Sequence, residues 1–386
     1  MSFSFVKTVG LVCLTVMPLS FSSRVAAQDD QYLQVSDYLD FEQVSDAQIS
    51  PDGTQIIYTR TWVDQKKDQN VSALWIMDAD GSRQRHLIDG SSARWSPTGD
   101  RVLFVAAGDN GRPQLFIRWM NAEGAVSQVT RIQITPMSPT WSPDGRQIAF
   151  AAIVPASDTW SIDMPVAPEG ATWSKAPRIV DKLHYRQDRV GFTDPGFSHL
   201  FVVPAESGKA IQLTQGEWNV GAQFGGLFIG AGLSWMPDSK TIVFDGLHEP
   251  SGEFAYRRSN IYTLDIETRQ FHQLTSEEGT WTSPAVSGDG RKIAFAGYPA
   301  SDMTYEMPRL YVMNVDGSKA RQVSDSFDQS PTSLFWSSGD RGVYFTAEDH
   351  GYLNAYHMSL DGRVRSVTRG HHVAGLQSIN GRSGIG

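Results

Sequence analysis

The sequence contains very little cysteine: its 386 residues include one, Cys13. Residues 1–27 are typical of a secretory signal peptide, because Lys7 precedes an apolar run, residues 9–19, that is too short to span a bilayer. Small residues at 25–27 then offer a cleavage site. Cys13 lies in the segment that cleavage removes, so we expect a mature chain without disulfides, thiol nucleophile or thiolate metal ligand. We therefore predict a secreted or periplasmic protein with no membrane span after cleavage.

A basic stripe is also lacking. The chain has 33 Lys and Arg residues against 42 Asp and Glu, which gives a formal net charge of −9. Nucleic-acid binding needs clustered positive charge to neutralise phosphates, so we exclude nucleic acid as a partner. The nine histidines show no HExxH or similar metal-ligand spacing. We expect no metal site and no cofactor.

The sequence is rich in one repeated unit of a large apolar residue, a tight turn and a strand. Its clearest copy begins at Trp141, continues through Ser-Pro-Asp-Gly at 142–145 and ends at Phe150. Further copies begin at residues 49, 95, 235, 286 and 336, and a fainter one at 377. Most copies follow one another at intervals of about 40 to 50 residues, a period typical of four-stranded propeller blades.

Each complete copy is followed by a second alternating strand and a strand that ends in an apolar residue and Thr or Ser. This pattern predicts an all-β fold, a β-propeller of WD40-like or TolB-like blades. We expect six complete blades over residues 49–372 and the start of a truncated seventh over 373–386. Residues 28–48 are expected to form a linker or short helix. The tryptophans that open four copies, Trp95, Trp141, Trp235 and Trp336, are expected to pack between blades.

One interval is about twice as long as the others, because residues 155–198 interrupt a blade. Only one second half, starting at Leu200, falls inside this interval, which favours one blade with a long insertion over a hidden extra blade. Such an insertion is often a binding loop on a propeller face. The alternative is a structural flap over a blade edge.

Two stretches carry a resemblance to a known family. The chain opens with Asp37-Tyr38-Leu39 and residues 44–53, VSDAQISPDG, and the insertion contains residues 184–192, HYRQDRVGF, before HLFVV at 199–203. These stretches resemble the amino-terminal β-propeller of the prolyl oligopeptidase family of serine peptidases, especially its acylaminoacyl-peptidase-like branch. The resemblance covers nearly all of the mature chain. The resemblance implies a propeller without a nucleophile, which covers a following α/β-hydrolase domain and filters peptides by size.

A nucleophile elbow, Gly-x-Ser-x-Gly between a strand and a helix, is missing from this chain. Residues 381–386 come nearest, but Ile385 replaces the final Gly. We therefore interpret the chain as a fragment that gates peptide access to a hydrolase domain and is inactive alone. The alternative is a stand-alone propeller similar to TolB, a periplasmic envelope protein, that binds a protein partner on one face. The short stretch before the first repeat favours the peptidase interpretation.

Candidate site residues are few. Asp52, Asp144, Asp238 and Asp289 recur in the repeat turns, where turn geometry explains them without a ligand. The resemblance implies a role for Glu277 and Glu278, because paired glutamates bind the substrate amino terminus in the dipeptidyl-peptidase branch; the alternative is a solvated acidic turn. Arg186 and Arg189 in the insertion can bind a substrate carboxylate or an acidic partner. Their alternative is a pair of ion pairs within the propeller.

Overall fold

The computed structural model describes residues 33–385 with gaps at 122, 157–164, 175–177, 181–182, 184, 189–190, 194–195, 207, 222, 225–226, 229–230, 250–251, 253, 256, 304, 372, 374–378 and 381–383. The chain divides into two units, Met1–Asp40 and Phe41–Gly386. The expected signal peptide and Arg189 lie outside the described residues. No helix in the described ranges has the length and hydropathy needed to cross a membrane.

The described part of the first unit contains one short 3-10 helix, η1 (Val35–Leu39). Its start is stabilised by the backbone N–H of Gln34, which donates to the Asp37 carboxylate at 2.7 Å. A short helix was one of the two alternatives expected for residues 28–48.

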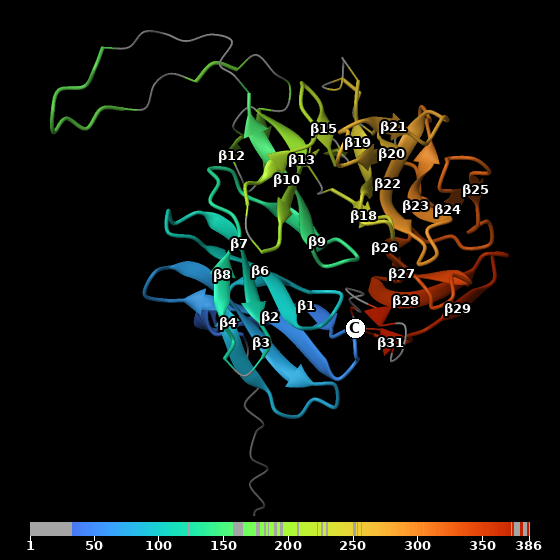
Figure 1. The fold of residues 1–386 in the computed structure, drawn as a ribbon, viewed down its shortest axis with the longest axis horizontal. Coiled ribbons are helices and arrows are strands. Elements are labelled where there is room, and N and C mark those ends of the chain that lie inside the picture. Colours follow the sequence, from blue (N-terminus) through green and yellow to red (C-terminus); the bar gives the residue numbers. More distant parts are fainter. Residues whose placement is uncertain are drawn as a thin grey trace, which may run out of the picture. The chain divides into compact units, whose positions relative to one another are not determined.

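The second unit is a propeller of six antiparallel blades, which confirms the predicted fold class (Figure 1). The inner strands of successive blades contact one another, and each blade is one contiguous segment of the chain. Blade 1 contains β1 (Glu42–Ile49), β2 (Gln55–Asp64), β3 (Gln69–Asp78) and β4 (Arg85–Asp89). Blade 2 contains β5 (Ser91–Trp95), β6 (Arg101–Ala107), β7 (Pro113–Trp119) and β8 (Val126–Gln128). Blade 3 contains β9 (Met137–Trp141), β10 (Gln147–Pro155), β13 (Gly196–Pro204) and β14 (Ile211–Gln212).

Blade 4 differs because its inner strand is split into β15 and β18, which both pair with β19. Its strands are β15 (Asn219–Val220), β18 (Leu233–Trp235), β19 (Thr241–Leu247), β20 (Asn260–Asp265) and β21 (Phe271–Gln273). Blade 5 contains β22 (Gly279–Val286), β23 (Lys292–Pro299), β24 (Arg309–Asn314) and β25 (Arg321–Gln322). Blade 6 contains β26 (Thr332–Trp336), β27 (Gly342–Asp349), β28 (Tyr352–Ser359) and β29 (Val364–Ser366).

Three two-stranded hairpins lie outside the blades. They are β11 (Arg186–Gln187) with β12 (Gly191–Phe192), β16 (Gln223–Phe224) with β17 (Leu227–Phe228), and β30 (Ile379–Asn380) with β31 (Gly384–Ile385). The first lies in the expected insertion, which the structure bounds at Pro155 and Gly196. The third occupies the stretch expected to start a seventh blade. At the other end, β1 begins at Glu42, inside the stretch 28–48 expected to be a linker or short helix.

The Ser-Pro-Asp-Gly turns between the first and second strands are held by their own side chains. Ser142 Oγ donates to Asp144 Oδ1 at 2.6 Å, and the same carboxylate oxygen accepts the N–H of Arg146 at 3.0 Å. Gly145 has a φ of +68°, a conformation that costs glycine little. The turns at Asp52 and Asp289 have the same bonds, and Asp238 accepts the N–H of Lys240. The recurring aspartates therefore have the structural role predicted for them.

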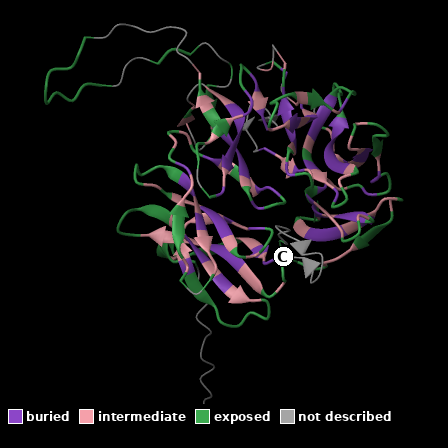
Figure 2. Cartoon of the chain, in the orientation of Figure 1, coloured by how far each residue is buried: buried purple, intermediate pink, exposed green. Residues whose placement is uncertain are grey.

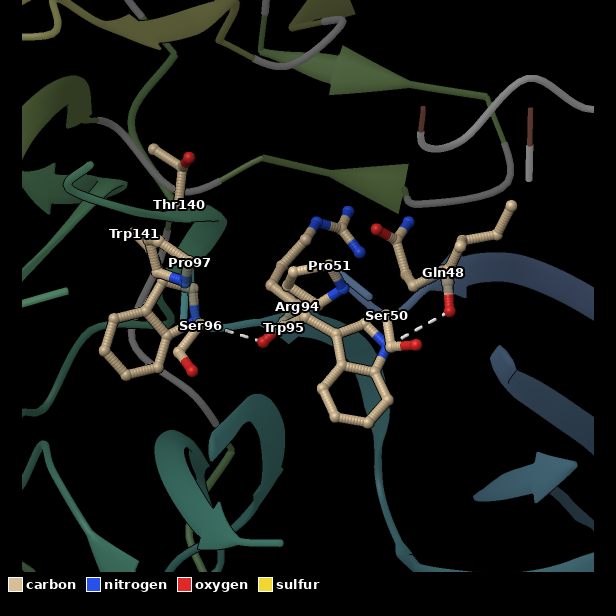
Figure 3. A pocket seen from close by; sticks show the side chains of 10 residues that line it. Gln48, Ser50, Pro51, Arg94, Trp95, Ser96, Pro97, Thr140 and Trp141 are labelled. Carbon is tan, nitrogen blue, oxygen red and sulfur yellow. Dashed lines mark hydrogen bonds between the residues drawn. The ribbon is translucent and has the colours of Figure 1, made fainter. Parts of the chain in front are cut away.

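The repeated tryptophans tie each inner strand to the one before it. In every case indole Nε1 donates to a backbone oxygen of the preceding blade, as two dashed lines in Figure 3 show. The pairs are Trp95 to Gln48 (3.1 Å), Trp141 to Arg94 (3.0 Å), Trp235 to Thr140 (3.4 Å) and Trp336 to Ala285 (2.8 Å). Each acceptor directly precedes the equivalent repeat position. We call this series the indole ladder; it confirms the predicted packing between blades.

The inner strands also share a β-bulge three residues before the ladder position. The residue at this point has a positive φ in five blades: Asp46, Ser92, Ser138, Ser283 and Ser333, with φ between +50° and +57°. The pairing register shifts at the same places. A bulge bends and twists its strand, so the inner strands curve in the same way from blade to blade.

Blade 5 interrupts the indole ladder, because Val286 stands where blades 2, 3, 4 and 6 have tryptophan. A buried carboxylate, Asp245 of β19, links blades 4 and 5 instead. One oxygen accepts the N–H of Gly232 in blade 4 and the other the N–H of Ser283 in blade 5, both at 2.9 Å. Burial raises the pKa of Asp245 to about 6, although the backbone donors act in the opposite direction.

Aromatic pairs across the second and third strands fill the core between blades. In blades 2 to 6 two rings stack with centroids 5.3 to 5.8 Å apart: Phe104–Phe116, Phe150–Phe201, Phe244–Tyr262, Phe295–Tyr311 and Phe345–Tyr356. In blade 1 the same places are taken by Tyr58 and Trp75. Figure 2 shows buried residues along the strands and exposed residues on the turns and the long connection of blade 3.

The indole ladder gives a stability prediction at Trp141. Trp141→Phe keeps the ring and loses the donor, so we expect the free energy of unfolding to fall by about 1 kcal/mol. Trp141→Ala also empties the space between blades and should cost about 3 to 5 kcal/mol. Urea unfolding followed by circular dichroism measures both. The control is Trp173→Ala, which removes an exposed tryptophan of the insertion; equal losses at Trp141 and Trp173 would contradict the ladder.

Asp245 gives a pH prediction. Its folded pKa is raised above the ordinary value of 3.8, so its contribution to stability is complete below about pH 4 and is lost as the pH rises through about 6. A shift of about two units corresponds to about 3 kcal/mol. We expect the difference in unfolding free energy between the natural chain and Asp245→Asn to fall by about 3 kcal/mol between pH 4 and 7.5. A difference that stays constant over this range would show that Asp245 titrates normally.

Candidate functional site

The candidate site lies at the end of the blades opposite the Ser-Pro-Asp-Gly turns. Strand direction alternates within each blade, so the connections between second and third strands and those between successive blades lie at the same end. In blades 3, 4 and 5 the connections between the second and third strands are long and cover residues 156–195, 248–259 and 300–308. Together with residues 274–278, which lead into blade 5, they form what we call the B–C face. Long loops on a rigid scaffold are common places for binding.

Glu277 and Glu278 both lie on this face and both are exposed. Backbone bonds fix their position: Glu277 O accepts the indole N–H of Trp281, and Glu278 O accepts the N–H of Ala300, each at 2.7 Å. The Glu278 carboxylate lies 2.5 Å from the Arg258 guanidinium. The Glu277 carboxylate makes no hydrogen bond or ion pair with a described residue. Burial raises the pKa of Tyr311, and the negative charge of Glu277 adds to this increase.

Arg186 stands in the β11–β12 hairpin of the insertion and is exposed. Its guanidinium has no hydrogen bond or ion pair within the part of the chain that the structure describes. Arg178 supports the hairpin: its guanidinium lies 5.2 Å from the Phe192 ring centroid and donates to Thr193 O at 3.1 Å. Arg186 and the two glutamates share the B–C face, but no contact between them is found among the described residues.

The sequence analysis missed two features of this face. One is Arg258, which pairs with Glu278 and also lies 3.9 Å from Glu249. The other is a set of exposed large apolar side chains. They include Phe254 at 71%, Met303 at 67% and Tyr305 at 76%, together with Tyr185 and Phe192 at the hairpin. Their signal in the sequence is an aromatic or Met residue in a loop that lacks the alternation of a strand.

His199 opens the stretch HLFVV at residues 199–203, which carries part of the resemblance to the peptidase family, and it has a structural role. Its Nδ1 lies 3.1 Å from the Thr214 hydroxyl, which accepts the N–H of Leu200 at 2.9 Å. Equivalent clips occur with Gln114 and Thr130, Asn260 and Thr275, and Asn354 and Thr368. Burial lowers the pKa of His199, so the ring is neutral at pH 7. The Thr that ends the second half of blades 2, 3, 4 and 6 is thus explained as part of a strand clip.

A metal ion has no obvious site in the described ranges, where no three His, Cys, Asp or Glu side chains are placed to hold one. The described side chains of the B–C face are suited to binding. Among its described residues it presents the guanidinium of Arg186 and the carboxylate of Glu277, both without a partner, together with an ion pair and apolar surface.

Comparison with known proteins supports a relation to peptidases. Residues 172–305 match the family model described as the dipeptidyl peptidase IV (DPP IV) N-terminal region, and this range contains most of the B–C face. Over 355 residues, 87% of this chain, the sequence is 24% identical to dipeptidyl-peptidase 5 of Porphyromonas gingivalis. The matched part is 49% of that protein, so the chain spans about half the length of this relative.

Solved structures agree on the fold. The acylaminoacyl peptidase of Pyrococcus horikoshii matches 89% of this chain with 48% of its own, at 19% identity and a TM-score of 0.65. The β-propeller domain of the Trilobed protease from Pyrococcus furiosus matches 86% of this chain with 85% of its own, at 16% identity and a TM-score of 0.57. The matches in sequence and in fold confirm the resemblance drawn from the two stretches at 37–53 and 184–203. The chain is thus a β-propeller whose sequence is similar to that of dipeptidyl-peptidase 5 and, over residues 172–305, to the N-terminal region of dipeptidyl peptidase IV.

Proposed function

We propose that this chain is the non-catalytic propeller of a secreted or periplasmic serine peptidase of the prolyl oligopeptidase family, and that its B–C face holds a hydrolase domain and gates peptide access to it. The observation that carries the proposal is the gathering of exposed apolar side chains on this face. Phe254, Met303 and Tyr305 come from two blades, and Tyr185 and Phe192 from a third. Exposed large apolar side chains on one face of a protein indicate an interaction surface.

The rest of the face fits an interface that also contacts a peptide. Arg186 offers a planar pair of donors to a carboxylate, and Arg189 is proposed to act with it. Glu277 offers its carboxylate to a peptide amino group. Glu278 is already neutralised by Arg258, so we propose that it sets the charge of the rim and contacts the substrate only when this pair opens. Peptides that fit between the propeller and the hydrolase domain would be accepted and larger ones excluded.

The parent activity is tested by sequencing the DNA beyond the codon for Gly386. A reading frame that encodes Gly-x-Ser-x-Gly, followed by an Asp and a His, would support a serine peptidase. The joined chain should then cleave aminoacyl p-nitroanilides and prefer short peptides over proteins, and the propeller alone should cleave neither. Unrelated sequence after a well-supported stop codon would sink the proposal. It would favour the stand-alone envelope scaffold, which pull-down of a stable partner from envelope extract would then test.

The docking role is tested by removing apolar groups from the B–C face. We expect the pair Phe254→Ser and Tyr305→Ser to weaken association with the separately expressed hydrolase domain at least tenfold, because both side chains would lose their burial in the complex. The matched control is the pair Val126→Ser and Val364→Ser, which removes exposed apolar groups from the outer strands β8 and β29. Isothermal titration calorimetry gives the affinities. Equal weakening by both pairs would show that the hydrolase domain docks elsewhere.

A further inference from the structure

A pocket of about 440 Å³ lies at the turn end of blades 1 to 3, away from the B–C face. Its walls are residues of three neighbouring inner strands and of the turns that follow two of them. The polar lining comes from Gln48, Arg94 and Thr140, and the apolar lining from Pro51, Pro97 and the ladder tryptophans. Gln48, Arg94 and Thr140 all hold the position just before the ladder residue, so the indole ladder itself aligns them.

The guanidinium of Arg94 is fixed from one side. Its Nη1 donates to both carboxylate oxygens of Asp46, at 2.9 and 2.8 Å, and to the backbone oxygen of Ala93 at 2.6 Å. Asp46 belongs to blade 1 and is held in turn by Gln48 Nε2 at 3.0 Å. Two blades therefore position one guanidinium before any ligand arrives.

The other edge of the same guanidinium carries N–H donors that can bind a ligand. Nε and Nη2 of Arg94 make no hydrogen bond with a described residue, and neither does the hydroxyl of Thr140. Figure 3 shows the side chains of Arg94, Thr140 and Gln48 on one side of the strands and the two indole rings on the other. The Arg94 side chain is 33% exposed, so these donors are within reach of a ligand from solvent.

We propose that this pocket binds a carboxylate, specifically the C-terminal carboxylate of a short peptide. The Nε and Nη2 edge of a guanidinium matches the two oxygens of a carboxylate, and the Thr140 hydroxyl adds a third donor. The proline rings offer apolar contact to the side chain next to that carboxylate. The volume lies within the range of small-molecule sites.

The charge of the site argues for an acceptor-rich ligand. Asp46 already uses Nη1, so a cation or an amine would meet only donors at the open edge of Arg94. A C-terminal amide offers one acceptor and two further donors to the same edge, and it should bind poorly. The site lies at the turn end, so it does not depend on docking at the B–C face.

Binding is tested on the purified chain by isothermal titration calorimetry with N-acetyl-Ala-Ala as the free acid and as its C-terminal amide. We expect the acid to bind at least tenfold more tightly than the amide. Arg94→Lys keeps the charge but loses the paired donors, and should weaken binding of the acid at least tenfold. Thr140→Val should weaken it about threefold. Arg85→Gln, on the exposed outer strand β4 of blade 1, is the control and should leave the affinity unchanged.

Several results would overturn the proposal. They are equal binding of acid and amide, no binding of either at millimolar concentration, and equal weakening by Arg85→Gln and Arg94→Lys. Circular dichroism shows whether Arg94→Lys still folds, since Arg94 also joins two blades. The comparison of acid with amide needs no substitution, and it decides the proposal even if that variant unfolds.

Discussion

The hydrogen bond from each ladder tryptophan to the inner strand of the blade before it is the constraint on which the propeller depends. It joins residues in neighbouring blades, and its acceptor always directly precedes the equivalent repeat position. A blade shifted by one residue would lose its bond and turn its side chains to the wrong face. The indole ladder therefore fixes both the spacing of blades and their register. Where Val286 breaks it, the buried carboxylate of Asp245 supplies the missing link between blades 4 and 5.

Much of this fold was predictable, because the residues within each repeat unit determine its turn and the buried side of its strands. Pro143, Asp144 and Gly145 specify a turn by local chemistry, and Trp141 and Phe150 specify which side of each strand is buried. The Thr or Ser that closes each second half was visible as a pattern. Its bond to the third strand was not, because the partner lies about 14 residues away. The bulges in the inner strands were also missed, since the Asp and Ser residues at these positions are equally common in ordinary turns.

The candidate site was less predictable than the fold. Glu277 and Glu278 could be placed in a loop, but the pairing of Glu278 with Arg258 joins two connections that are adjacent only in the propeller. The sequence around Asp245 reads as an ordinary buried strand. The role of Asp245 as a link between blades becomes visible only when Val286 is found in place of a ladder tryptophan in blade 5. Arg94 carries no local signal, because the other polar residues of its pocket are each 46 residues away in the sequence. Sites that depend on three blades need the blades to be assembled first.

The contiguous build of each blade has a consequence for how the chain folds. In blades 1, 2 and 6 the second and third strands are joined by short connections, so these blades can pair their strands locally as they leave the ribosome. In blade 3 the partners β10 and β13 are separated by the 40 residues from 156 to 195. Closing so long a loop costs about 2 kcal/mol more chain entropy than closing one of about five residues. We therefore expect blade 3 to pair its second and third strands later than blades 1, 2 and 6.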